Sequence, residues 1–469
     1  MKTVLALLVT LSCSATALAQ DANGSSGGPY GWTTMGGIKK LPHDGRPDAK
    51  VEFPQIQDWK SLKISLQRAP CFGSCPAYRV DIHGDGTVVY DGQMYVAIPG
   101  IHKAKITDDS VHSLFAAFQK ADFFWLLDSY AAPITDNPTK VISISFDGRT
   151  KDVKDYVGRA IGMPQVVTEL ESLIDTTADT KKWVVGNAET IDALKSEGWR
   201  FSAPDDQNVK LLEGAAETHN ADLVEELLKL GMPATNKYGC RALSEAARHR
   251  DVQMARALFT ANAPIRFEPH AKPVADPHTE EEQQAVIDYY ESACDVLQTA
   301  ATFGSPEIVE LVLSRKPDVN ETFPGSDDGR TPLMSLAGNS GDPMVTQDGA
   351  NFGRCAQLLI EAGADVNAVD KNGNTAIMGA GDIEVVRAII AAGVKDINAR
   401  NSLGQTALMR TYDTNVIRAL LEAGADPYLK DKQGQTAMDH AADFNDPKLK
   451  ETLENWMRGH PKPPQPDHP

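Results

Sequence analysis

The sequence predicts an α+β N-terminal domain followed by an all-α solenoid of stacked helical repeats. Between residues 59 and 183, stretches of alternating apolar and polar residues are interspersed with stretches of helical periodicity. This mixture is typical of one compact domain with a sheet and helices. Between residues 184 and 457, similar sequences return, and Gly363–Asp365 recurs as Gly424–Asp426. Such recurrence predicts units that bury their apolar faces only against their neighbours.

The first 19 residues have the features of a secretory signal peptide. A lysine precedes the apolar run Val4–Leu11, and the small residues Ala17–Ala19 form a cleavage site. The run is shorter than the about 20 residues that a membrane span needs. Lipid attachment at Cys13 is an alternative, but Thr10–Ser12 is a poor lipoprotein signal. We therefore expect an exported bacterial protein, periplasmic or secreted.

The chain carries a formal net charge of −18, with its acidic residues spread throughout. This distribution argues against nucleic acid, which requires a clustered basic face. No segment beyond the signal peptide is long and apolar enough to span a membrane. Residues 20–58 are rich in Gly, Ser and Pro and predict a flexible linker. Residues 458–469 predict a disordered, proline-rich tail.

The domain at residues 59–183 begins with a half-buried strand, because Leu62, Ile64 and Leu66 alternate with polar residues. A tight turn at His83–Gly86 then joins two further strands into a hairpin. Thr107 is a suitable cap for a helix that carries apolar residues at helical spacing. We predict strands at 61–67, 78–82, 88–90 and 141–146, and helices starting at 107 and spanning 164–174.

Cys71 and Cys75 lie close together between the first two predicted strands. In an oxidising compartment such a pair is expected to form a disulfide. A redox couple is one alternative, although a catalytic dithiol needs a lowered pKa, usually from a helix N-terminus or nearby cations. A metal site is another, but a second cysteine pair at ligand spacing is missing.

The region from about residue 60 to 183 resembles a bacterial family of domains of unknown function. The resemblance rests on Cys71–Pro76, on Tyr78, on the Asp85–Gly86 turn and on a strand at Asp152–Tyr156. It implies no activity, so we expect no catalytic residue, no cofactor and no metal. The loop after Asp81 faintly echoes a calcium-binding loop, but its twelfth position is a glycine and not the bidentate glutamate.

The repeats resemble the ankyrin repeat, whose units of about 33 residues pair a β-turn with two helices. Gly363 closes an outer helix, residues 365–373 form a projecting hairpin, and Thr375 caps the next inner helix with its hydroxyl. We expect about six units, with residues 187–203 and 447–457 as caps. The positions equivalent to Thr375 are Lys210, Arg241, Asp295, Thr331, Thr406 and Thr436.

Two insertions interrupt the repeats. Residues 264–291 lie between two units and include Thr279–Glu282, a capping box that opens a short helix. Residues 338–352 separate the two helices of one unit. Such excursions are often surface loops without a role, and in other repeat proteins they form part of the binding face.

Three further cysteines lie in the repeats. Cys240 and Cys294 stand just before the capping positions of successive units. Stacked units lie about 10 Å apart, so we expect partly buried free thiols and consider a bridge the alternative. Cys355 is expected to be a small core residue of an outer helix.

These patterns predict a non-enzymatic interaction scaffold that binds a protein partner through the concave face of the repeats. The alternative is a thiol-redox or other enzyme in the first domain, with the repeats recruiting its substrate. Neither the partner's identity nor the oligomeric state follows from the sequence, because one fold serves many ligands. Candidate contacts, each at or beside a predicted hairpin tip, are Tyr238, Asp328, Arg330, Lys371, Asn372 and Gln433.

Overall fold

The computed structural model describes residues 41, 45–71, 73–202, 206–269, 279–323, 328–342, 345, 349–443 and 446–461. The expected signal peptide at 1–19, much of the linker and the tail from 462 lie outside these residues. The chain forms two compact units, Met1–Leu223 and Val224–Pro469, which we describe separately. Within the described residues, no helix has the length and apolar character needed to cross a membrane.

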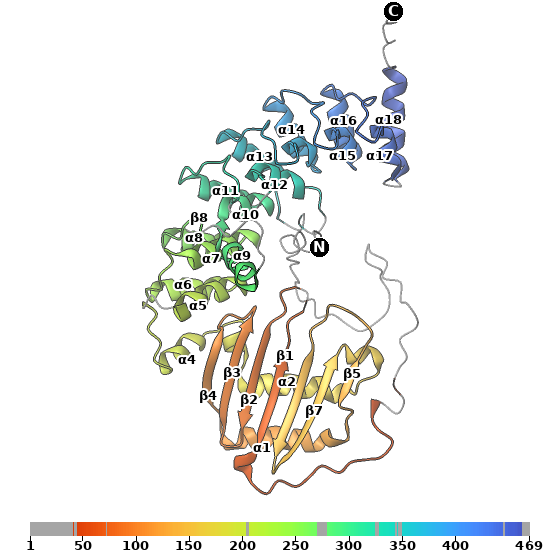
Figure 1. The fold of residues 1–469 in the computed structure, drawn as a ribbon. Coiled ribbons are helices and arrows are strands. Elements are labelled where there is room, and N and C mark those ends of the chain that lie inside the picture. The colour runs from red at the N-terminus through yellow and green to blue at the C-terminus, as the bar shows by residue number, and fades with distance from the viewer. Residues whose placement is uncertain are drawn as a thin grey trace, which may run out of the picture. The chain divides into compact units, whose positions relative to one another are not determined.

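The first unit is built on a seven-stranded sheet with the order β4-β3-β2-β1-β6-β7-β5 (Figure 1). Neighbouring strands are antiparallel, except that β5 runs parallel to β7. The strands are β1 Lys63–Arg68, β2 Ala77–His83, β3 Thr87–Met94, β4 Gly100–Lys105, β5 Ser129–Ala131, β6 Lys140–Phe146 and β7 Arg149–Tyr156.

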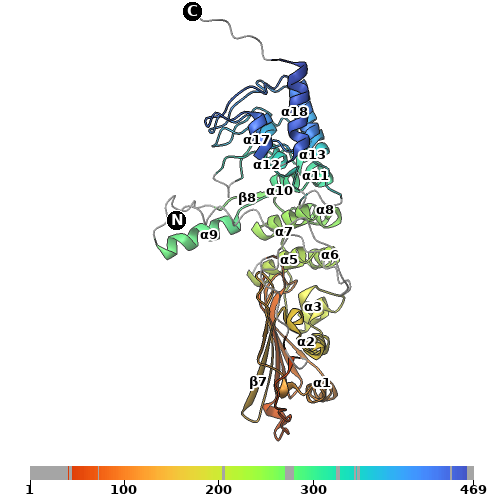
Figure 2. The same cartoon turned by 90° about the vertical axis from the view of Figure 1, so that its right-hand side faces the viewer.

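Two helices cover one face of this sheet. Helices α1 (Asp108–Lys120) and α2 (Gln165–Ala178) lie on the same side, together with α3 (Lys181–Val184) (Figure 2). Alternation along β1 places Ile64 and Leu66 on the covered side, where both are completely buried. The side chain of Thr107 caps α1 by accepting the backbone N–H of Ser110, which confirms the predicted start.

The first unit continues past the domain boundary expected at residue 183, through α4 (Thr190–Ser196) and α5 (Asp206–Glu217). The backbone N–H of Ala97 donates to the carbonyl oxygen of Val184 across 2.8 Å. A carboxylate oxygen of Glu197 accepts the N–H of Lys103, a residue of edge strand β4, across 2.9 Å. Pairing edge groups in this way removes donors that another strand could use.

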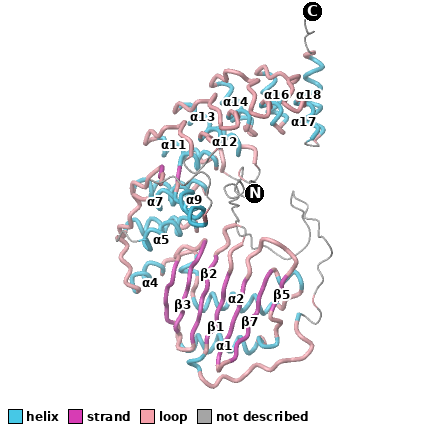
Figure 3. The backbone as a smooth tube through the Cα atoms, in the orientation of Figure 1, coloured by secondary structure: helices cyan, strands magenta, loops and turns pink. Residues whose placement is uncertain are grey.

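The second unit is a stack of helix pairs in two layers. The inner layer contains α7, α10, α12, the short 3-10 helix η6, α15 and α17, and the outer layer contains α8, α11, α13, α14, α16 and α18. Figure 3 shows loops joining successive pairs along the stack. The bounds of the inner helices are Lys237–Arg248, Val296–Thr302, Pro332–Asn339, Ala376–Met378, Ala407–Arg410 and Ala437–Asp443. Those of the outer helices are Val252–Thr260, Pro306–Leu313, Phe352–Glu361, Ile383–Ala391, Thr414–Glu422 and Pro447–Gly459, and α6, Ala221–Lys229, spans the boundary between the units.

The expected capping positions are only partly correct. Asp295 and Thr331 cap α10 and α12 with their side chains, as predicted. Lys210 and Arg241 instead lie inside α5 and α7, which corrects the register of the early units. Helix α7 begins earlier because the side chain of Asn236 accepts the N–H groups of Tyr238 and Gly239.

The hydroxyl caps predicted in the later repeats are also partly wrong. The hydroxyl oxygens of Thr375 and Thr406 are buried and make no hydrogen bond within the described residues. Both threonines precede short inner helices, η6 and α15. The hydroxyl of Thr436, in contrast, donates to the carboxylate of Asp439 across 2.7 Å. Where the inner helix is short, the chain before it is held by the hydrogen bonds of the hairpin and not by a threonine cap.

Both insertions lie where the sequence placed them. In the first, β8 (Arg266–Phe267) pairs with β9 (Cys294–Asp295), and α9 (Glu280–Ser292) lies between them in sequence. Thr279 and Glu282 form the predicted capping box at the start of α9. The second insertion separates α12 from α13.

Candidate partner-binding face

The last three hairpin tips of the described repeats are each folded around one buried polar side chain. Asp370 accepts the N–H groups of Asn372 and Asn374 through one carboxylate oxygen, at 2.8 Å each. Asn401 and Asp431 hold the next two tips in the same way, with their carbonyl or carboxylate oxygens bonded to the second and fourth following N–H groups. All three side chains belong to buried residues. The buried side chain therefore holds the backbone of each tip, so the other side chains of the tip are not needed for this purpose.

Consecutive tips are joined by backbone hydrogen bonds. The N–H of Lys371 donates to the carbonyl oxygen of Asp328, and that of Ser402 to Asn372. The N–H of Lys432 donates to Leu403 across 3.0 Å. Four tips from four successive units thus form one connected row, which we call the tip row (residues 328–330, 369–374, 400–405 and 430–435). A connected row is preorganised for binding, because less conformational freedom is lost on contact.

Three candidate residues from the sequence occupy equivalent places in the tip row. Asp328, Asn372 and Gln433 each stand immediately before the glycine of their tip. Leu403 is the residue at this place in the tip between Asn372 and Gln433, and it is 48% exposed. Leu403 could not be recognised as a candidate from its residue type, because leucine is usually a buried core residue. The signal that could have found it is its alignment with Asn372 and Gln433.

Two further apolar side chains of the repeats are exposed, one in the tip row and one outside it. Val369, the first residue of its tip, is 62% exposed, and Tyr412, which follows α15, is 53% exposed. The hydroxyl of Tyr412 lies close to Gly341 and Gly381, and a Cβ atom at Gly341 would lie only 2.8 Å from it. Within the tip row, the exposed aliphatic side chains are therefore those of Val369 and Leu403.

Two arginines flank the buried Asp370 carboxylate. The guanidinium group of Arg330 lies 3.2 Å from Asp328 and 3.9 Å from Asp370. Arg410, on α15, donates to the carbonyl oxygen of Met378 across 3.0 Å. Burial and the nearby charge of Arg330 lower the pKa of Arg410. The positive charges of Arg330 and Arg410 both interact favourably with the negative charge of Asp370.

Tyr238 differs from the other five candidates. It lies in the first turn of α7, and Lys237 approaches its ring with the ammonium nitrogen 5.0 Å from the centroid. The structure therefore brings Asp328, Arg330, Lys371, Asn372 and Gln433 into the tip row and places Tyr238 on an inner helix. Tyr238 was predicted at a hairpin tip because the start of this inner helix was expected at Arg241, whereas α7 begins at Lys237.

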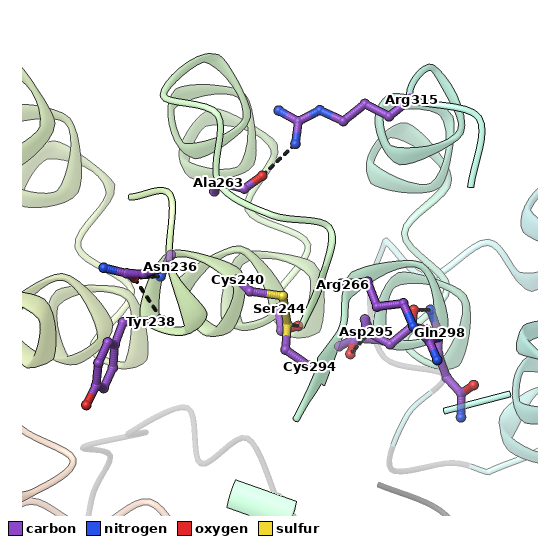
Figure 4. Close-up of a disulfide and its surroundings, with 12 residues drawn as sticks. Asn236, Tyr238, Cys240, Ser244, Ala263, Arg266, Cys294, Asp295, Gln298 and Arg315 are labelled. Carbon is purple, nitrogen blue, oxygen red and sulfur yellow. Dashed lines mark hydrogen bonds and ion pairs between the residues drawn. A yellow bond between two sulfur atoms is a disulfide. The ribbon is translucent and has the colours of Figure 1, made fainter. Parts of the chain in front are cut away.

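Cys240 and Cys294 form a disulfide, which corrects the expectation of free thiols. Figure 4 shows the bond between α7 and β9, with Ser244 beside it. The two Cα atoms are 6.1 Å apart, within the range that a disulfide can bridge. The spacing of about 10 Å applies to helix axes, whereas Cys294 precedes α10, where the chain passes close to α7.

The bridge is part of a larger anchor for the first insertion. Arg266 on β8 donates to Asp295 across 2.6 Å and to the carbonyl oxygen of Thr322 across 3.0 Å. Arg315 donates to the carbonyl oxygen of Ala263 (Figure 4). Both ends of the insertion are therefore held on the stack. Cys355 is a buried free cysteine, as expected, and burial raises its pKa to about 12.

Cys71 and Cys75 form the predicted disulfide in the loop between β1 and β2. Arg68, at the end of β1, lies 2.6 Å from the carboxylate of Asp175 on α2. The hydroxyl of Tyr78 donates to the same carboxylate across 2.7 Å, and burial raises the pKa of that hydroxyl. The disulfide thus closes the loop, and a polar cluster of Arg68, Tyr78 and Asp175 anchors the ends of the two strands that it joins.

Glu171 stands beside this cluster and is 1% exposed. One of its carboxylate oxygens accepts Lys140 across 2.8 Å, while the other has no hydrogen-bond partner within the described residues. Burial raises the pKa of Glu171, although Lys140 opposes that change. Within the described residues, no group of three or more His, Cys, Asp or Glu side chains is arranged to hold a metal ion.

Comparison with known proteins identifies one segment in each of the two units. Residues 62–178 match the model of a domain of unknown function (DUF6438). Residues 297–401 and 344–431 match the model of ankyrin repeats (3 copies). No curated protein matches the chain. The first unit therefore contains a DUF6438 domain, the tip row belongs to ankyrin repeats, and ankyrin repeats support a role in protein–protein interaction.

Proposed function

We propose that this protein is an exported, non-catalytic scaffold that binds a protein partner through the concave face and hairpin tips of its ankyrin repeats. The observation that carries the proposal is the tip row. Its backbones are connected, its turns are fixed by buried Asp370, Asn401 and Asp431, and its exposed side chains include Val369 and Leu403. An ordered surface with exposed aliphatic groups suits a partner with a complementary apolar patch.

Two features support export. The N-terminal residues have the composition of a signal peptide. Four cysteines form two disulfides, Cys71–Cys75 and Cys240–Cys294, and such bonds persist mainly in oxidising compartments. Fractionation of the native host, with the mature N-terminus determined by mass spectrometry, tests this part. A full-length chain in the cytoplasm with reduced cysteines would contradict it.

Affinity capture from the exported fraction tests the binding face. The wild-type protein is compared with the double variant Val369→Glu and Leu403→Glu, which places two charges in the tip row. Ile101→Glu is the matched control, because Ile101 is also apolar and 69% exposed but lies on β4 of the first unit. We expect a specifically captured protein to be lost with the tip variant and retained with the control. Equal capture by all three proteins would refute the binding face.

A thiol-redox role for the DUF6438 domain is the second candidate. It is favoured by the position of Cys71 and Cys75, both of which are partly exposed in a short loop. Under mild reductant, alkylation of the native protein distinguishes the two roles. A bond that opens readily and reforms supports redox chemistry, whereas one that resists until unfolding supports a structural bond.

A further inference from the structure

The tip row is basic on its outer surface, in contrast to the chain as a whole. In the three tips from residue 369 to 435, the exposed charged residues are Lys371, Arg400, Lys430 and Lys432. The full chain carries a formal net charge of −18. The four cations therefore make the exposed charge of these three tips positive, whereas the charge of the whole chain is negative.

The carboxylates of the same tips are turned inward. The side chain of Asp370 is 2% exposed and that of Asp431 is 0% exposed. Both accept backbone N–H groups of their own turns, and Asp431 also lies 2.9 Å from a ring nitrogen of His440. In the fourth tip, Asp328 is paired with Arg330. The acidic groups of these tips thus organise the turns, while the basic residues are exposed.

Exposed aliphatic side chains lie in two of the tips that carry these cations. Val369 stands two residues before Lys371, and Leu403 lies in the same tip as Arg400, next to the tip that carries Lys432. Partner carboxylates and an apolar partner residue could therefore be accommodated side by side. The spacing also suits an extended chain, since packed helices lie about 8–10 Å apart and a polyproline II helix advances about 9 Å per three-residue turn.

We propose that the partner presents an acidic, extended segment that lies along the tip row, with its carboxylates against Lys371, Arg400, Lys430 and Lys432 and an apolar residue against Val369 and Leu403. This inference rests on the proposed function and names the chemistry of the ligand. Opposite charges across an interface accelerate encounter and select among partners.

A nucleic acid is a less suitable polyanion for this surface. Single-stranded nucleic acids are bound by basic grooves with aromatic side chains on which bases stack. The exposed apolar residues among the cations are Val369 and Leu403, which are aliphatic. Aliphatic groups beside cations suit an acidic peptide that also carries apolar side chains.

Fluorescence anisotropy with the full chain tests the proposal. The probe is a short labelled peptide that repeats Glu-Leu-Pro, and the comparison peptide has lysine in place of each glutamate. Arg400→Glu with Lys432→Glu reverses two charges of the tip row. Arg387→Glu with Arg418→Glu makes the same change in net charge on outer helices α14 and α16, where both arginines are exposed.

We expect the acidic peptide to bind the wild-type protein and the control variant equally, and to lose about tenfold or more in affinity for the tip variant. Added salt should weaken binding. Equal binding of the lysine peptide, or no effect of the tip variant, would overturn the proposal. So would tighter binding of a single-stranded oligonucleotide at the same residues.

Failure of this proposal can be distinguished from failure of the proposed function. If Val369→Glu with Leu403→Glu abolishes partner capture while the charge-reversal variant does not, the binding face stands and its acidic ligand is wrong. If neither variant changes capture, both proposals fail. Circular dichroism of each variant checks that these exposed substitutions leave the fold intact.

Discussion

The backbone N–H of Lys432 donates to the carbonyl oxygen of Leu403 across 3.0 Å, while the side chain of Leu403 is 48% exposed. One residue therefore links two tips through its backbone and presents an aliphatic group through its side chain. Stability and binding can be separated at this position, because a side-chain substitution leaves the backbone bond in place. Substitutions of the buried residues that hold the turns should behave differently.

Replacement of Asp370 by alanine should destabilise the repeats by about 2 kcal/mol, because two backbone N–H groups lose their acceptor. Urea unfolding of the full chain, followed by circular dichroism, measures the change. Asp370→Asn is the matched control, since Asn401 occupies the same place in the next tip and accepts the equivalent N–H groups. An asparagine variant as unstable as the alanine variant would contradict this reading of the tip.

Loss of the Cys240–Cys294 bond should lower stability more than loss of the Cys71–Cys75 bond. The two cysteines are 54 residues apart in the first pair and 4 apart in the second. In the chain-entropy model, the longer loop contributes about 4 kcal/mol and the shorter about 2 kcal/mol. Paired serine variants and urea unfolding test this order, and a larger effect of the shorter loop would contradict it.

Alkylation of the unfolded but unreduced mature chain, which lacks Cys13, should label Cys355 and leave the four bridged cysteines unmodified. In the native protein, Cys355 should react slowly, because it is buried and its pKa is raised to about 12. Peptide mapping by mass spectrometry identifies the labelled position. Label on Cys240 or Cys294 before reduction would show that this bridge is absent in solution.

The stability of the first unit should depend on pH through Glu171. Burial raises the pKa of Glu171 in the folded chain above its unfolded value of about 4.3. The folded state therefore binds the proton of Glu171 more tightly than the unfolded state does. Protonation of Glu171 thus stabilises the folded state at low pH, and this stabilisation is lost as pH rises through the folded pKa. Glu171→Gln removes the titration and keeps an oxygen acceptor for Lys140.

We expect the stability of Glu171→Gln, relative to the wild type, to improve as pH rises from about 4 to 7. Urea unfolding monitored by tryptophan fluorescence at several pH values measures the difference. Glu169→Gln, at an exposed position of α2, is the control and should show a much smaller dependence. A difference between Glu171→Gln and wild type that stays constant with pH would contradict the account.

The sequence predicted the fold where side-chain periodicity was strong. Strands β1, β2, β3 and β6 alternate clearly, and α1 has a distinct cap. Edge strand β4 (Gly100–Lys105) and the three-residue β5 escaped because their residues have little apolar alternation. Helix starts in the early repeats were predicted at the wrong residues, because the later repeats have threonine before the inner helix, whereas α7 is capped by Asn236.

The site was predictable to the level of hairpin tips. Five candidates lie in the tip row because a turn with glycine is recognisable from the sequence. Leu403 was missed because exposure is a property of the folded tip, not of the residue type. The Cys240–Cys294 bond was missed because the approach of β9 to α7 depends on the pairing of β8 with β9, residues that are distant in sequence.

Site-specific photocrosslinking tests whether the partner contacts the tip row in the native host. A photoreactive residue is placed at position 403 in the tip row or at position 418 on outer helix α16, and the exported protein is irradiated in its native host. We expect a discrete crosslinked protein from position 403 and none from position 418. A crosslink from position 418 alone, or the same products from both positions, would contradict binding through the tip row.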